Sequence, residues 1–228
     1  MSDKTSLALA ECRQTTTVAF DALQTSEDPT IDQDLETLRR DYQSLLSLTY
    51  SAATKVALSL KPPKPDYQAS LVPIEDLANS SGALATCATL FSAARHGPAM
   101  RKKARSLASD VINAVRQLSA SLEGGDVYVL TGTIHDAIDS ARTQLPESEA
   151  AAVREVFRAN QACLDDGIPE LNELMQEPAE DDDAAGAGDG WDELDEEFGE
   201  GLSSKALTPE ERQRVTAVCH FRKPANLR

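Results

Sequence analysis

Histidine and cysteine are the residues of this chain best suited to catalysis or metal binding. The three histidines are His96, His135 and His220, and the four cysteines are Cys12, Cys87, Cys163 and Cys219. They are widely spaced, with no Cys-x-x-Cys pair and no partner at the spacing of a metal site. His135 and Asp136 are adjacent, but adjacent residues of a helix point in different directions. We therefore expect packing or surface roles for the histidines.

Sequence motifs of known chemistry are also missing. The chain contains no P-loop, no GxGxxG, no HExxH and no EF-hand loop. The run Asp181–Asp183 could attract divalent cations, but a metal site needs ligands in a fixed geometry. We expect a protein that is not an enzyme and that has no metal or cofactor. A cryptic active site would require a buried polar cluster, which the sequence does not reveal.

A basic cluster is the first feature that suggests binding. It comprises Arg95, His96, Arg101, Lys102, Lys103 and Arg105. Most of these residues fall at the start of a helix that Pro98 is expected to begin, where positive charge opposes the helix dipole at a cost of a few tenths of a kcal/mol each. Such a placement suggests docking of an acidic partner or of this chain's own acidic segment. A solvated charged face is the alternative.

That acidic segment spans residues 177–201, which hold twelve acids and no base, whereas the rest of the chain has 26 acids and 22 bases. Within it, Trp191, Leu194 and Phe198 are spaced i, i+3 and i+7, so a helix would place them on one face. This pattern is typical of a helical ligand that folds on binding in a groove. The partner could be another protein or this chain's own bundle, and a plain linker is the third alternative.

Charge and hydropathy restrict the class of partner and the compartment. A net charge of −16 argues against direct nucleic-acid binding, which needs clustered Lys and Arg. No apolar run approaches the roughly 20 residues that span a bilayer, and the first residues lack the features of a signal peptide. We expect the cytoplasm and nucleus, with reduced cysteines.

Apolar periodicity indicates the elements that carry these features. Its clearest stretch alternates four and three residues apart, through Ile31, Leu35, Leu38, Tyr42, Leu45, Thr49, Ala52 and Val56. Helices are expected over about 3–24, 31–61, 74–91, 98–123, 127–145 and 146–176, the last with a possible interruption at 167–169. Residues 127–130 could form a strand, but no second strand is available to pair with them. The expected fold is all-α, an up-and-down antiparallel bundle of five or six long helices.

The domain organisation follows from the same pattern. Residues 1–176 are expected to form the helical bundle, and residues 177–201 an acidic low-complexity linker that is disordered in isolation. Residues 202–228 are expected to form a short helix and an irregular C-terminus. The short helix is indicated by a capping-box pattern that starts at Thr208.

Several segments resemble one known family. They are Ser44–Pro63, Leu71–Phe91, Val127–Pro146, Ala150–Leu171, Gly190–Leu194 and Leu207–Arg212. In pattern and order they are similar to the cyclin-D-interacting GCIP-like family, in particular its fungal members. The resemblance implies a wholly helical protein whose partners are cyclin-type or helix-loop-helix-type regulators, and it implies no catalytic residues. It ends after Val218, where the family continues into a further helical region.

We therefore expect a non-enzymatic, protein-binding adaptor or regulator within cell-cycle control. The rival interpretation is a cytoskeletal or adhesion-type scaffold, since long helical bundles also serve there. The sequence leaves the partner and the oligomeric state open.

Overall fold

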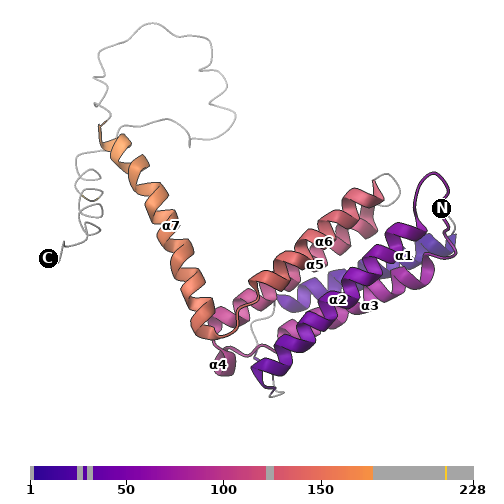
Figure 1. The fold of residues 1–228 in the computed structure, drawn as a ribbon, viewed down its shortest axis with the longest axis horizontal. Coiled ribbons are helices and arrows are strands. Elements are labelled where there is room, and N and C mark those ends of the chain that lie inside the picture. Colours follow the sequence, from indigo (N-terminus) through magenta and orange to yellow (C-terminus); the bar gives the residue numbers. More distant parts are fainter. Residues whose placement is uncertain (1–2, 25–27, 30–32, 122–125, 177–213, 215–228) are drawn as a thin grey trace, which may run out of the picture. The chain divides into compact units, whose positions relative to one another are not determined.

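A computed structural model describes residues 3–24, 28–29, 33–121, 126–176 and 214 (Figure 1). Its helices are α1 (Asp3–Leu23), α2 (Leu35–Ser59), α3 (Leu71–Thr89), α4 (Ala93–His96), α5 (Pro98–Ser121), α6 (Val127–Gln144) and α7 (Glu149–Gln176). The described residues form no strand, which confirms the all-α prediction and the helical interpretation of residues 127–130. The chain divides into two units, Met1–Val156 and Phe157–Arg228.

Local capping residues account for the starts of α2 and α6. Asp34 precedes α2 and accepts a hydrogen bond from the amide of Thr37 at 3.0 Å. Asp126 does the same for α6, with the amide of Tyr128 at 2.9 Å. Each carboxylate satisfies an amide that has no partner within its own helix.

Several features of the helices differ from the expectation; α7, for example, begins at Glu149 and not at residue 146. Helix α3 begins at Leu71, before Pro73, because a proline in the first turn loses no hydrogen bond. The short helix α4 was not anticipated; Ser92 caps it by accepting from the amide of Arg95 at 3.3 Å. Helix α7 continues through Pro169, where an interruption was considered.

Five long helices of the first unit form a closed ring. Going round it, α1 contacts α3, α3 contacts α2, α2 contacts α6, α6 contacts α5 and α5 contacts α1, while α3 also reaches α5 across the centre. Figure 1 shows these helices side by side. Helices α1 and α3 run parallel, as two contacts between them show. Near the start of both helices the Thr5 hydroxyl donates to the Tyr67 carbonyl, and further along both of them Thr15 lies against Gly82. This alternation of direction along the chain agrees with the expected up-and-down bundle.

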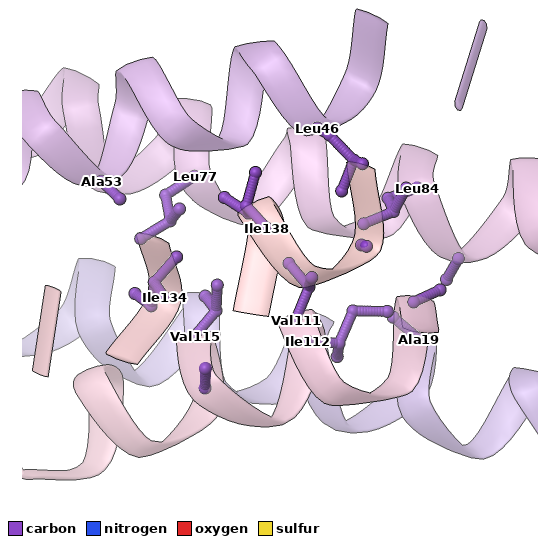
Figure 2. Packing of buried hydrophobic residues seen from close by; sticks show 14 of the residues in the cluster. Ala19, Leu46, Ala53, Leu77, Leu84, Val111, Ile112, Val115, Ile134 and Ile138 are labelled. Carbon is purple, nitrogen blue, oxygen red and sulfur yellow. The ribbon is translucent and has the colours of Figure 1, made fainter. Parts of the chain in front are cut away.

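The core lies inside this ring (Figure 2). Side chains from all five helices meet there, among them Ala19, Leu46, Ala53, Leu77, Leu84, Val111, Ile112, Val115, Ile134 and Ile138. Of the periodic positions on α2, Leu38, Tyr42, Thr49, Ala52 and Val56 are buried, whereas Leu35 and Leu45 are only partly buried. Each fully buried Leu or Ile contributes roughly 1.5–3 kcal/mol.

One buried polar contact fixes α2 against α5. The hydroxyl of Tyr42 donates a hydrogen bond to the backbone carbonyl of Ala104 at 3.0 Å, and the Tyr42 ring packs edge-to-face on Phe91. Burial raises the pKa of Tyr42 far above its usual range, so the phenol is a neutral donor. The contact satisfies a hydroxyl that would otherwise be costly to bury.

Candidate protein-binding surfaces

The first turns of α5 carry the basic cluster that the sequence singled out. The guanidinium of Arg101 lies 2.9 Å from the Asp28 carboxylate and is largely buried, with 15% of its side chain exposed. Lys103 donates to the Gln144 side chain at 2.8 Å and lies 3.7 Å from the Glu155 carboxylate. These two cations are therefore engaged within the bundle, whereas the neighbouring Lys102 is exposed.

Asp28 connects the basic cluster to α4. Its carboxylate accepts hydrogen bonds from the amides of Ala93 and Ala94, at 2.9 and 3.2 Å, and pairs with Arg101. The hydrogen bond from Ala93 is the main cause of a pKa of Asp28 below its ordinary value, and the bond from Ala94 and the charge of Arg101 add to it. An acid thus holds the N-terminus of α4 and a cation of α5 together.

A second acid offsets the unfavourable position of the basic residues. The Glu149 carboxylate accepts hydrogen bonds from the amides of Ala99 and Met100, at 3.1 and 2.7 Å. It therefore places negative charge at the N-terminus of α5, where it stabilises the helix dipole. By its position in the sequence, Glu149 would be expected to stabilise the start of its own helix, α7. That helix is instead capped by Ser148, whose hydroxyl accepts a hydrogen bond from the amide of Ala151 at 3.3 Å.

Gly97 makes this capping contact possible. Its φ angle is +95°, a left-handed conformation that residues with a Cβ rarely adopt. A Cβ at this position would also overlap the side chain of Glu149. Glycine is therefore required here for both its conformation and its size.

A polar pocket of about 360 Å³, called here the α1/α5 pocket, lies between the end of α1 and the face of α5. Its lining consists of Leu23, Gln24, Lys102, Arg105, Ser106, Ser109 and Asp110. Arg105 is buried, donates to the Leu23 carbonyl at 3.4 Å, and has a pKa lowered by burial and then by Arg101. Lys102 and Arg105 are the two members of the basic cluster that the fold brings into one pocket. Their cations would favour an acidic group of a partner at that end.

A second, more apolar groove of about 360 Å³ lies between α2 and α3. It is lined by Leu45, Leu48, Ser51, Ala52, Lys55, Asp76, Asn79, Ser80 and Ala83, and is called here the α2/α3 groove. Leu48 is 58% exposed. On the same two helices, Leu58 is 65% exposed and Val72 is 63% exposed. Our sequence reasoning missed this surface. The available signal was Leu48 and Leu58, apolar residues of α2 that lie outside its buried periodic set.

Two histidines are used in packing, as expected. The Ser92 amide donates to Nδ1 of His96 at 3.0 Å, so Nε2 carries the proton and donates to the Gln33 carbonyl at 3.0 Å. His135 stacks on Tyr50 with ring centroids 3.9 Å apart, and its Nε2 lies 3.1 Å from the Thr54 hydroxyl. His220 lies outside the described residues.

The cysteines in the described part of the chain are free thiols. Burial raises the pKa of Cys12 to about 12 and is the main cause of a similar value at Cys87. A protonated thiol is a poor nucleophile and a poor metal ligand. Among the residues that the structure describes, no group of His, Cys, Asp and Glu is placed to hold a metal ion.

The length of the helices and the position of the acidic segment bear on two further expectations. None of the helices in the described ranges has the length and apolar character needed to cross a bilayer. Trp191, Leu194 and Phe198, the apolar residues of the acidic segment, lie outside these ranges. The hypothesis that they form a helical ligand stays a prediction.

Comparison with known proteins gives one match. The family described as Grap2 and cyclin-D-interacting, N-terminal, matches residues 41–177, about three fifths of the chain. The match runs from within α2 to the residue after α7, and α1 precedes it. No curated protein and no solved structure is significantly similar to the chain.

Proposed function

The chain belongs to the Grap2 and cyclin-D-interacting family, and on this premise we propose that it is a non-enzymatic adaptor or regulator that binds proteins. The partners we propose are cyclin-type or helix-loop-helix-type regulators, within cell-cycle control in the cytoplasm and nucleus. The observation that carries the proposal is the family match. It includes the whole α2/α3 groove and the α5 residues of the α1/α5 pocket, whereas Leu23 and Gln24 of that pocket precede it.

The polar chemistry of the bundle supports a binding role. Tyr42, His96 and Glu149 each make hydrogen bonds that join separate parts of the fold. Their donors and acceptors are therefore occupied by structural contacts. The surface offers instead the polar α1/α5 pocket and the α2/α3 groove, and concave surfaces of this kind accept side chains of a protein partner.

The acidic segment adds a second mode of binding to the proposal. A helix over residues 190–199 would present Trp191, Leu194 and Phe198 together, with carboxylates on the other faces. Large aromatic side chains are common anchors in protein interfaces. We propose that these three residues bind in a groove of a partner protein. The alternative is that they dock on the basic residues of this chain, and Trp191 fluorescence distinguishes the two.

Affinity purification of the full chain, followed by mass spectrometry, tests this function. We expect enrichment of cyclins, cyclin-dependent kinases or helix-loop-helix regulators, confirmed by titration of the purified chain with a purified D-type cyclin. Enrichment of actin-linked proteins without these partners would contradict the proposal and favour the scaffold interpretation. Cell fractionation tests the expected location.

Matched variants assign the binding mode. Replacing Trp191, Leu194 and Phe198 by Ala should weaken partner binding if the acidic segment is the ligand. Lys102→Glu should weaken it if the α1/α5 pocket receives an acidic partner. Lys64→Glu is the control for charge, because Lys64 is exposed in the connection between α2 and α3, away from that pocket.

A further inference from the structure

The lining of the α2/α3 groove includes Lys55 and Leu48 of α2 and Asp76 and Ala83 of α3, and the exposed Leu58 and Val72 lie outside it, toward the α2–α3 connection. Moving away from the α2–α3 connection, α2 presents Leu58, Lys55 and then Leu48. Since α3 runs the opposite way, it presents Val72, Asp76 and then Ala83. Each helix therefore presents an exposed apolar residue, a charged residue and a second apolar residue at similar numbers of residues from the α2–α3 connection.

The two walls differ in charge and in size. Lys55 on α2 and Asp76 on α3 are both exposed, and the structure records no ion pair between them. At the far end, the large side chain of Leu48 on one wall corresponds to the small Ala83 on the other. The α2 wall is thus complementary in charge and size to the α3 wall, whereas two α2 walls, or two α3 walls, would not be complementary to each other.

We propose that the α2/α3 groove is the interface of a two-fold symmetric dimer of this chain. A two-fold axis parallel to the helices places α2 of one copy against α3 of the other at the same height. Lys55 then faces the partner subunit's Asp76, and Leu48 faces the partner subunit's Ala83. Leu58 faces the partner subunit's Val72, which covers two exposed apolar side chains.

Symmetry is the reason to choose a second copy as the occupant. A two-fold interface brings the same surface together twice, so the surface must be complementary to itself. Most surfaces fail this requirement, because like charges meet or large side chains collide. Here the opposite charges lie on opposite walls, so each dimer forms the Lys55–Asp76 pair twice. The groove is also nearly neutral in a chain whose net charge is −16.

This inference goes beyond the proposed adaptor function, and it uses neither the α1/α5 pocket nor the acidic segment. Failure of cyclin binding and failure of dimerisation are therefore separate outcomes. A chain that binds its partner only as a monomer would contradict the dimer and leave the proposed function in place.

Sedimentation equilibrium of the full chain over a range of micromolar concentrations tests the dimer. We expect concentration-dependent dimerisation. Lys55→Glu and Asp76→Lys should each raise the dissociation constant about tenfold or more, because each change replaces two ion pairs by two repulsions. Leu48→Glu should also abolish the dimer. The controls are Lys102→Glu for charge, at an exposed lysine of α5 outside the groove, and Leu7→Glu for an exposed leucine of α1.

Mixing two of the variants gives the most specific result. A Lys55→Glu copy and an Asp76→Lys copy each repel themselves but are complementary to each other, so an equimolar mixture should form heterodimers. Helical circular dichroism of each variant shows that it is folded. A wild-type chain that is monomeric throughout, a dimer that Lys55→Glu and Leu48→Glu leave unchanged, or a mixture that stays monomeric would each overturn the proposal.

Discussion

The Oε2 atom of Glu149 lies 2.7 Å from the backbone nitrogen of Met100, so a side chain from the start of α7 caps the N-terminus of α5. The two residues are 49 positions apart in the chain. The contact offsets the positive charge of Arg101 and its neighbours in the first turns of α5. It also makes the first turn of α7 part of the bundle, where Ala152 is buried.

Glu149→Ala should destabilise the bundle by about 1–2 kcal/mol, because two amides at the start of α5 lose their acceptor and the dipole loses its compensating charge. Urea unfolding followed by circular dichroism measures this loss. Glu147→Ala is the matched control, since Glu147 is exposed and has no such contact in the described structure. Equal losses for the two variants would contradict the capping role.

Gly97→Ala should cost about 1–3 kcal/mol, because a Cβ is strained at φ = +95° and collides with the Glu149 side chain. The two causes can be separated with Glu149→Ala, which removes the collision and leaves the strain. The double variant should therefore lose less free energy of unfolding than the sum of the two single variants. Strict additivity would mean that the collision has no effect.

Tyr42→Phe should destabilise the bundle by about 0.5–1.5 kcal/mol, because the buried hydrogen bond from the hydroxyl to the Ala104 carbonyl is lost while the aromatic packing on Phe91 is kept. Tyr128→Phe is the control, as Tyr128 is an exposed residue of α6. The measurement is the midpoint and slope of urea unfolding. A change of the same small size in both variants would show that the hydrogen bond contributes nothing to stability.

Asp28 should make stability depend on pH in the acid range. Its pKa is lower in the folded chain than its ordinary value, so the ionised form stabilises the fold. This contribution is present above the ordinary pKa and is lost as the pH falls below about 4. Asp28→Asn should therefore have a lower free energy of unfolding than the wild type at pH 7. The difference in free energy of unfolding between the two proteins should become smaller as the pH is lowered. Asp136→Asn, which removes an exposed carboxylate of α6, is the matched control for the change of charge.

Trp191 fluorescence should distinguish the two proposed uses of the acidic segment, since it is the chain's single Trp. Docking on the basic residues of α5 predicts a blue-shifted emission that moves red in Lys102→Glu and at high salt, where screening shortens the Debye length below about 8 Å. Lys102 is the informative position, because Arg101 pairs with Asp28 and its replacement would disturb α4. A fully solvated emission with no response to Lys102→Glu would exclude self-docking.

Much of the fold could be predicted from local patterns. The periodicity through Leu38, Tyr42 and Val56 indicated both the second helix and its buried face, because helix formation and amphipathicity are properties of neighbouring residues. Pro98 marked a helix start for the same reason. The order of the helices round the ring could not be predicted from the sequence, because many different orders would bury the same apolar faces.

The candidate surfaces needed the tertiary structure. The sequence by itself determined that Arg101, Lys102, Lys103 and Arg105 are close together, because all four lie in the first turns of one helix. It could not show that Asp28 and Glu155 pair with two of them, since those acids lie far away in the chain. Only the packing of α2 on α3 decided that Leu48, Lys55 and Asp76 share one groove. Helical periodicity acts within a few residues, whereas a binding surface depends on contacts between helices that local sequence does not encode.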